Sequence, residues 1–148
     1  MNTILFDISG NRALVDINNI QEILEKPKEI TKIVDSNEWI NGLIDLRGEG
    51  ITIIDLKTII NADGENNDVV NKPVVIILKN KSGEKLGVEV DNIHHVQEIT
   101  EDNEIIQNNS EGYNQFFPTV VKVSNKLTFI FDVETIFHEY NNKNHKKG

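Results

Sequence analysis

The stretch INGLIDLRGEGITIIDL, residues 40–56, decides the fold. Two runs rich in β-branched residues, LIDL and ITIIDL, flank the four residues RGEG. Short apolar runs of this composition are typical of β-strands. Glycine in the connection supplies the positive φ angles that a tight turn or bulge requires. The stretch therefore predicts two strands joined by a tight connection at residues 47–50.

Similar runs occur along the rest of the chain, and turn-rich stretches separate most of them. They include ILFDIS, ALVDI, VVIILK, KLGVEV, TVVKV and LTFIFDV. Helical signals are weak and short, at residues 56–60, after Asp91 and at residues 133–140. Many short strands at close spacing predict an all-β protein, a small barrel or sandwich.

The chain also repeats itself. ILFDISGNRALVDINNIQEI (4–23) resembles VIILKNKSGEKLGVEVDNIHHVQEI (75–99), and IIDLKTII (53–60) resembles IFDVETIF (130–137). The offset between copies grows from 73 residues at the Ser-Gly turns to 77 at the last pair, as small loop insertions would produce. We expect two similar β units at about 1–70 and 71–140, between which elements can exchange, and a polar tail at 141–148. Chance similarity among Ile/Val-rich strands is the alternative.

Bulk composition restricts the classes of function. The 148 residues suffice for one well-filled domain, and the net charge of −9 argues against a nucleic-acid or anionic-membrane surface. The absence of cysteine excludes disulfides, thiolate metal sites and cysteine nucleophiles. The N-terminus does not look like a signal peptide, and no apolar run is long enough to span a membrane. We expect a cytoplasmic protein.

Arg47 needs an explanation beyond the turn, since Arg12 is the only other arginine. A guanidinium suits a bidentate contact to a carboxylate. The partner could be Asp45, Glu49 or Asp55 within the fold, or it could belong to another protein. Asp55 and Asp132 each stand where a strand gives way to a helical signal, so we expect both to act as helix N-caps.

No motif points to catalysis, a cofactor or a metal. The adjacent histidines His94 and His95 would point to opposite faces of a regular strand, so they cannot share one metal ion. A phosphate loop, a nucleophile elbow and a buried pair of carboxylates are all missing from the sequence. We expect a protein that is not an enzyme.

These segments together resemble the CheW family of bacterial chemotaxis adaptors. GLIDLRGEGITIIDL is similar to the family's segment around Leu-Arg-Gly, and the two repeated segments fit its first hairpin and its Val-rich strand. The resemblance covers roughly residues 3–138. Two departures are Asp45, where the family usually has Asn, and Thr52, where it often has Pro. Since a carboxylate cannot donate as an amide does, Asp45 puts the local hydrogen bonds in question.

The resemblance implies two five-stranded, SH3-like β-barrels packed side by side, with short helical turns and a short C-terminal helix. It implies an adaptor that links chemoreceptors to a CheA-type histidine kinase at membrane receptor arrays. The receptor's helical tip would lie in an apolar groove at the seam of the barrels. Residues matching the family's receptor-facing positions are Ile20, Glu22, Gly42, Arg47, Val74 and Val75.

Each of these residues has an expected role. Ile20, Val74 and Val75 would supply apolar contact, and Gly42 would permit close backbone approach. Arg47 and Glu22 would set register and specificity by charge. For the kinase we expect the outer positions of the first hairpin, Ile8, Val15 and Ile17.

Two alternatives stay open at this point. The chain could serve a non-flagellar chemosensory system, or it could be a small acidic β-barrel that binds a ligand or an oligonucleotide.

Overall fold

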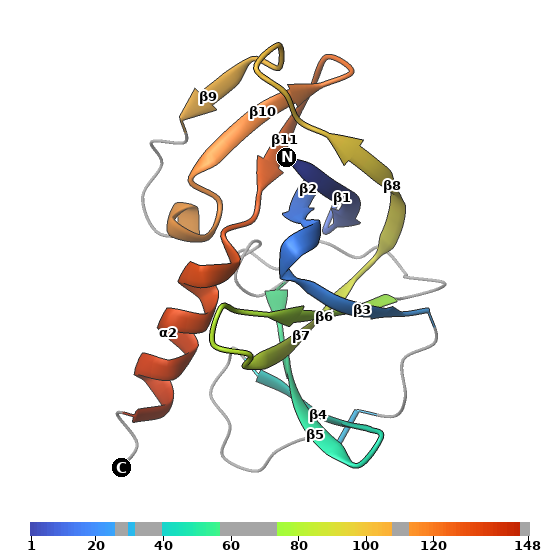
Figure 1. The fold of residues 1–148 in the computed structure, drawn as a ribbon, viewed down its shortest axis with the longest axis vertical. Coiled ribbons are helices and arrows are strands. Elements are labelled where there is room, and N and C mark those ends of the chain that lie inside the picture. Colours follow the sequence, from blue (N-terminus) through green and yellow to red (C-terminus); the bar gives the residue numbers. More distant parts are fainter. Residues whose placement is uncertain (26–29, 32–39, 57–73, 108–112, 146–148) are drawn as a thin grey trace.

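The computed structural model describes residues 1–25, 30–31, 40–56, 74–107 and 113–145 (Figure 1). In chain order they form β1 (Asn2–Ile8), β2 (Asn11–Asp16), the 3₁₀ turn η1 (Ile17–Asn19), β3 (Ile20–Leu24), β4 (Ile40–Leu46), β5 (Glu49–Ile54), β6 (Val74–Lys79), β7 (Lys85–Val90), β8 (Asn92–Glu98), β9 (Ile105–Gln107), the 3₁₀ turn η2 (Tyr113–Phe116), β10 (Thr119–Val123), β11 (Lys126–Ile130) and α2 (Val133–His145).

The strands form two sheets of corresponding order. The six-stranded sheet runs β8-β1-β2-β11-β10-β9, and the five-stranded sheet runs β3-β6-β7-β5-β4. In each sheet an edge strand is followed by an antiparallel hairpin, β1–β2 or β6–β7. A second hairpin, β10–β11 or β4–β5, then joins through a parallel pairing, β11 with β2 or β5 with β7. This correspondence supports the internal repeat.

The two halves of the chain exchange strands between the sheets. The first hairpin, β1–β2, pairs with β8 and β11 from the second half, and the hairpin β6–β7 pairs with β3 and β5 from the first half. Neither sheet is therefore made from one half alone. The predicted boundary near residue 70 lies outside the described residues, so the division into two halves stays a prediction.

Both sheets carry buried apolar side chains on both faces. The largest group lies between the sheets, and we call it the seam cluster: Phe6, Ile8, Ala13, Val15, Ile54, Leu56, Ile76, Leu78, Leu86, Val88, Val90, Phe116, Phe117, Phe131, Val133, Ile136 and Phe137. One interior cluster fills the five-stranded unit (Ile44, Leu46, Ile51, Ile53, Val75, Ile77). A second fills the six-stranded unit (Leu5, Leu14, Ile99, Val121, Val123).

This arrangement explains the consecutive apolar residues in several strands. Successive side chains of a strand point to opposite faces. Ile53 accordingly enters an interior cluster while Ile54 enters the seam cluster, and both are fully buried. Val75 and Ile76 divide in the same way on β6. The apolar pairs therefore fill the seam between the two units.

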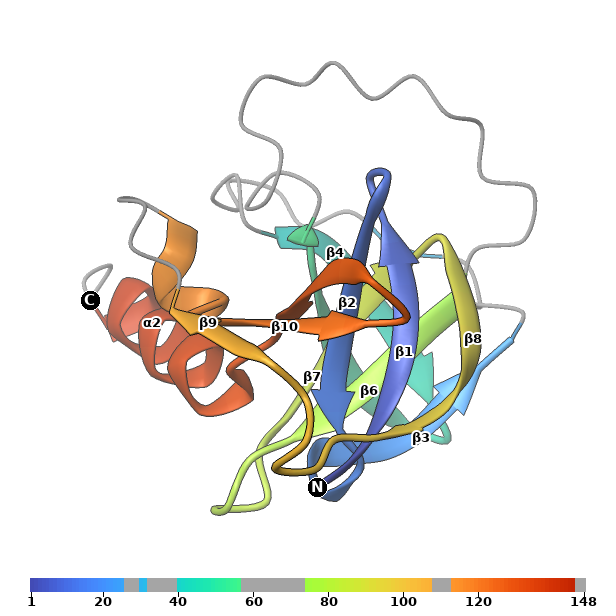
Figure 2. The ribbon, with the colours of Figure 1, turned by 90° about the horizontal axis from the view of Figure 1, so that it is seen from above.

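The C-terminal helix α2 closes one side of the seam. The carboxylate of Asp132 accepts a hydrogen bond from the Thr135 backbone N–H at 3.2 Å, which confirms its predicted role as N-cap. Ile136 and Phe137 enter the seam cluster, and the Tyr140 hydroxyl lies 3.3 Å from Thr52 Oγ1 on β5. The helix lies on the opposite side of the molecule from β3 and β8 (Figure 1 and Figure 2).

The predicted fold class is confirmed: the described chain is mostly strand, in two β units with one short C-terminal helix. Two details differ from the sequence-based expectation. One sheet has a sixth strand, β9, and α2 continues to His145, into the segment predicted as a polar tail. Among the described helices, none has the length and apolar character needed to cross a membrane.

The seam cluster predicts how stability responds to truncation. Ile76→Ala removes a fully buried side chain between the sheets and should lower the free energy of unfolding by about 2–5 kcal/mol. Leu127→Ala, at a side chain that is 58% exposed, should change it by about 0.5 kcal/mol or less. Urea unfolding followed by circular dichroism measures both. Equal losses of unfolding free energy in the two variants would contradict the conclusion that packing in the seam cluster stabilises the protein.

Candidate functional site

The connection between β4 and β5 is a two-residue turn. Arg47 (φ 52°) and Gly48 (φ 86°) both adopt positive φ, the pattern of a type I′ hairpin turn. The Gly48 N–H donates to Asp45 Oδ1 at 2.8 Å, so the carboxylate needs only to accept here. The prediction of a glycine at positive φ is confirmed for Gly48. It is wrong for Gly50, which lies inside β5 opposite Asp45.

The turn points Arg47 at Glu22 on β3. The guanidinium makes a bidentate contact with this carboxylate, with Nη1 lying 3.3 Å from Oε2 and Nη2 bonded to Oε1. The predicted intramolecular partners, Asp45, Glu49 and Asp55, are therefore not the bidentate partner. The two charges expected to face a receptor instead hold each other. The Arg47 side chain is 68% exposed, so the pair is accessible from solvent.

This contact sets the charge state of the pair. The hydrogen bond from Arg47 lowers the pKa of Glu22 below its ordinary value, and the positive charges of Arg47 and Lys85 act in the same direction. The hydrogen bond to Glu22 raises the pKa of Arg47 in turn. Lys85 itself pairs with Glu49 at 3.0 Å. Both members of the Glu22–Arg47 pair are thus ionised at neutral pH.

The pair predicts a titration result. Arg47→Gln removes the main cause of the shift, so the pKa of Glu22 should rise toward its ordinary value, as measured by carboxyl ¹³C NMR. A carboxylate with a lowered folded-state pKa contributes stability above its unfolded pKa, and that contribution disappears as pH falls through the folded-state value. The wild type should therefore lose more stability than Arg47→Gln on acidification through the Glu22 titration. An unchanged titration of Glu22 would contradict the contact.

Gly42 on β4 permits close approach of the protein's own backbone. A Cβ at this position would lie 2.2 Å from the carbonyl oxygen of Thr31 and 2.9 Å from a methyl group of Ile30. Thr31 and Leu43 exchange two backbone hydrogen bonds of 2.8 Å, which draw the segment at 30–31 against β4. The close approach that the structure shows at Gly42 is that of Thr31 in the same chain, and an approach by a receptor stays a prediction.

Gly42→Ala should therefore destabilise the five-stranded unit by about 1–3 kcal/mol, the usual range for overpacking a tight site. Gly50→Ala is a matched control in the same hairpin, because a Cβ there meets no atom within 4 Å. Thermal unfolding of both variants measures the difference. A Gly42→Ala protein as stable as Gly50→Ala would contradict the contact with Thr31.

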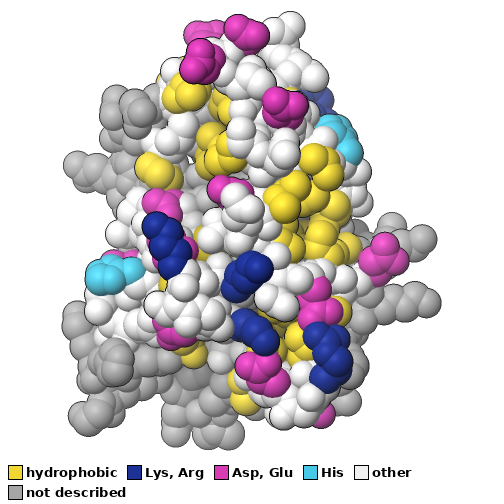
Figure 3. Space-filling model, viewed as in Figure 1, with side chains coloured by type: hydrophobic (Ala, Val, Ile, Leu, Met, Phe, Trp, Pro, Cys, Tyr) yellow, Lys and Arg dark blue, Asp and Glu magenta, His cyan; other side chains and the backbone are white. Residues whose placement is uncertain are grey.

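An apolar groove lies between the edge strands β3 and β8. It has a volume of about 830 Å³, and its lining residues are Ile23, Leu24, Glu25, Val74, Asn92, Ile93 and His94. Ile20, Ile23, Val74 and Ile93 are half-buried and pack against the seam cluster, so the groove floor is continuous with the core. Figure 3 shows hydrophobic side chains gathered over this region, with charged side chains of both signs below them.

Sequence reasoning missed several exposed apolar residues. Val96 on β8 is 58% exposed and lies opposite Ile4, on the same face of the sheet as Ile93. It does not line the groove itself, but it is an exposed apolar residue on β8, the strand that forms one wall of the groove. The sequence did contain a signal for Val96. The segment Val96-Gln97-Glu98-Ile99 repeats Ile20-Gln21-Glu22-Ile23, so Val96 corresponds to Ile20, which was predicted to contact a receptor. A separate exposed apolar set, Ile105, Ile106 and Leu127, lies on β9 and β11.

A model of the CheW-like domain family matches residues 2–141 of the chain. The chain belongs to the CheW-like domain family. The chemotaxis protein CheW of Thermotoga maritima is 28% identical over 134 residues, which cover 90% of this chain and 85% of that protein. The crystal structure of scaffolding protein TtCheW from Thermoanaerobacter tengcongensis matches with a TM-score of 0.75 and 28% identity, covering 88% of this chain and 83% of that chain.

Membership confirms the resemblance predicted from residues 40–56 and from the repeated segments. CheW-like proteins are non-enzymatic adaptors or scaffolds, so the expectation of a protein that is not an enzyme is confirmed by the family.

The predicted binding residues of this CheW-like chain divide by burial. Val74 lines the groove and Ile20 is half-buried against the seam cluster, but Val75 is fully buried in an interior cluster and offers no surface to a partner. The expectation that Ile8 and Val15 occupy outer positions of the first hairpin is also wrong, because both are fully buried in the seam cluster. Ile17, in η1, is half-buried.

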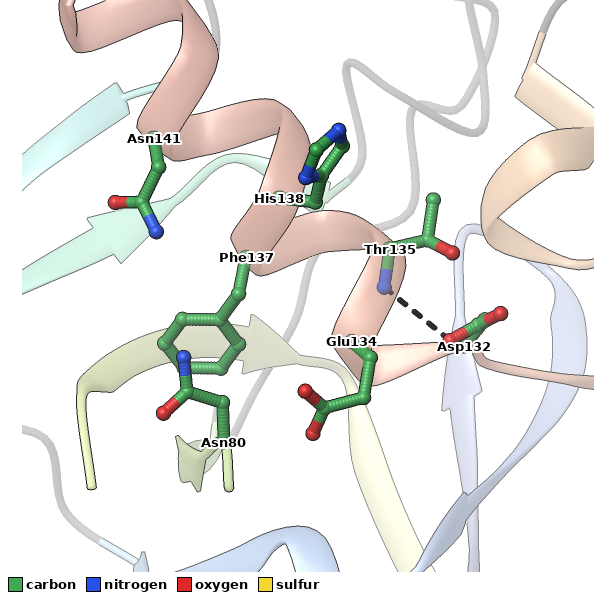
Figure 4. Close-up of a pocket in the computed structure, with 7 residues that line it drawn as sticks. All are labelled: Asn80, Asp132, Glu134, Thr135, Phe137, His138 and Asn141. Atoms are coloured by element: carbon green, nitrogen blue, oxygen red, sulfur yellow. Dashed lines mark hydrogen bonds between the residues drawn. The ribbon is translucent and has the colours of Figure 1, made fainter. Parts of the chain in front are cut away.

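A second hollow, of about 470 Å³, lies between α2 and the end of β6 (Figure 4). Its lining is largely polar and includes Asn80, Glu134 and His138. The Asp132 carboxylate in it is engaged as the helix cap. Among the residues that the structure describes, no group of three or more His, Cys, Asp or Glu side chains could hold a metal ion. The capping partners expected for Asp55 lie outside the described part of the chain.

Proposed function

We propose that this protein is a non-enzymatic adaptor that couples chemoreceptors to a CheA-type histidine kinase at membrane receptor arrays in the cytoplasm. Family membership supports the adaptor role in chemotaxis. The observation that carries the receptor half of the proposal is the groove between β3 and β8. Its apolar lining residues, Ile23, Leu24, Val74 and Ile93, suit an amphipathic helix that lays its apolar face into a groove.

Within this proposal, the apolar contacts come from Ile20, Ile23, Val74, Ile93 and Val96. Glu22 lies on β3, the strand that also carries Ile20 and Ile23, and its ion pair with Arg47 of the β4–β5 turn is accessible from solvent. An ion pair at the rim of an interface contributes mainly to register and partner choice. Gly42 then acts indirectly, because it keeps the strand next to the Arg47 turn in place.

The kinase half of the proposal rests on the family. Barrel-against-barrel docking requires an apolar surface outside the groove. Of the predicted kinase-facing residues, only Ile17 is not fully buried. Ile17 in η1 therefore remains as the proposed contact from that set.

A binding assay tests the proposal. The purified protein should form a ternary complex with a CheA-type kinase and a receptor cytoplasmic fragment encoded in the same genome, and kinase activity should rise only when all three are present. Failure to bind either partner at tens of micromolar, a weak affinity for a specific interface, would rule the adaptor role out.

Two variants locate the receptor site. Val96→Asp places a charge beside the groove, on the face of β8 that carries Ile93, and should weaken receptor binding at least tenfold, since the carboxylate loses water on docking. Leu127→Asp is a matched control, because Leu127 is equally exposed (58%) but lies on β11, away from the groove. It should bind the receptor fragment like the wild type in the absence of kinase. Equal weakening by both variants would place the receptor elsewhere.

A further inference from the structure

The strand pairing at the groove is irregular at one residue. Leu5 of β1 lies opposite His95 of β8, and Phe6 lies opposite Ile93, so His94 is an extra residue with no partner in β1. This is a β-bulge, a feature that redirects a side chain and often occurs beside functional sites. The expectation that His94 and His95 simply alternate across a regular strand does not hold here.

The bulge brings the His94 ring to a carboxylate on the neighbouring strand. Nε2 of His94 lies 2.7 Å from Oδ2 of Asp7, and each side chain is about one-third exposed or less (27% and 33%). A carboxylate at this distance fixes the ring orientation and holds the proton of a neutral imidazole on Nε2. Nδ1 is then a hydrogen-bond acceptor.

The two adjacent histidines therefore differ in what they can do. His94 lines the groove, together with Ile23, Val74 and Ile93. His95 is not part of the lining, and its Nε2 lies 3.3 Å from Gln97 Oε1. Only one of the pair is held by a carboxylate at the wall of the candidate docking site.

We propose that His94 is the polar recognition residue of the groove, and that Asp7 positions it. Nδ1 of His94 accepts a hydrogen bond from an amide or ammonium side chain on the bound helix. This inference rests on the proposed docking of a receptor helix in the groove. Charge favours a donor over a carboxylate on the partner, because the groove also carries Glu25 and the chain has a net charge of −9.

The proposal gives binding a defined dependence on pH. Within the residues that the structure describes, the charged and titratable groups around His94 include Asp7 on β1, Arg12 opposite Asp7 on β2, His95 on β8, Glu25 at the groove and Asp91 just before β8. Histidine is the side-chain type whose charge ordinarily changes within the physiological pH range. Protonation removes the acceptor at Nδ1 and adds a charge that repels an ammonium group. Affinity should therefore fall as pH falls.

The test measures the affinity of the full chain for a receptor cytoplasmic fragment from the same genome, between about pH 8 and pH 5.5, across the histidine range. For the wild type, affinity should fall as the pH is lowered within this interval, by up to about tenfold per pH unit, the limit for one linked proton. H94Q keeps an acceptor oxygen and should lose this dependence, while H95Q should retain it. Groups on the receptor titrate equally in all three experiments and cancel.

A second measurement isolates the role of Asp7. Long-range ¹H–¹⁵N NMR of the imidazole should show the proton on Nε2 of His94 in the wild type and a mixture of tautomers in D7A. D7A should also bind several-fold more weakly at about pH 8, because the His94 ring loses the carboxylate that orients it.

The outcomes separate this inference from the proposed function. If the wild type binds the fragment and H94Q shows the same pH profile as the wild type, the role of His94 is overturned and the groove remains the docking site. A neutral His94 with its proton on Nδ1 overturns it as well. No binding of the fragment by the wild type at any pH overturns both.

Discussion

The rest of this structure depends on one constraint: two sheets, each with apolar side chains on both faces, pack against each other. A strand whose neighbouring residues are both apolar needs cover on both faces. In this chain each unit covers one face of its sheet with an interior cluster, and the other unit covers the second face through the seam cluster. Either unit alone would expose the seam face to water, a surface larger than monomeric proteins usually leave uncovered.

Strand exchange strengthens this dependence. Each half of the chain supplies a hairpin to one sheet and the flanking strands to the other. Backbone hydrogen bonds and side-chain packing therefore join the halves in both units. The helix α2 adds a third connection, because it follows β11 of one sheet and contacts Thr52 of the other through Tyr140.

The candidate docking site is a consequence of the seam. Where the sheets end at β3 and β8, the half-buried residues that pack against the seam cluster, Ile23, Val74 and Ile93, line the groove. The apolar floor is therefore held by the same packing that holds the units together. A preformed groove of this kind avoids the cost of ordering its wall when a helix binds.

Much of the fold was predictable from the sequence, but the faces of the strands were not. Short β-branched runs, Ser-Gly turns and repeated segments are local signals, and they suffice for the fold class. The prediction that Ile8, Val15 and Val75 lie on an outer surface was wrong. Alternation along a strand shows which residues share a face, but when both faces are apolar it does not show whether either face is exposed. Contacts set by long-range register were equally hidden: Glu22 meets Arg47, and Thr31 meets Gly42, only because the five-stranded unit brings their strands together.

The bulge at His94 has a counterpart in the sequence, which we interpreted as an insertion in a loop. The offset between repeat copies is 75 residues at Asp16 and Asp91 and 76 at Gln21 and Gln97, so one inserted residue lies between Asp91 and Gln97. Growth of the offset is ordinarily explained by loops, which tolerate insertions. Here the extra residue lies within β8. An insertion inside a paired strand must shift its register, and the shift turns one of two adjacent histidines toward Asp7 at the wall of the groove.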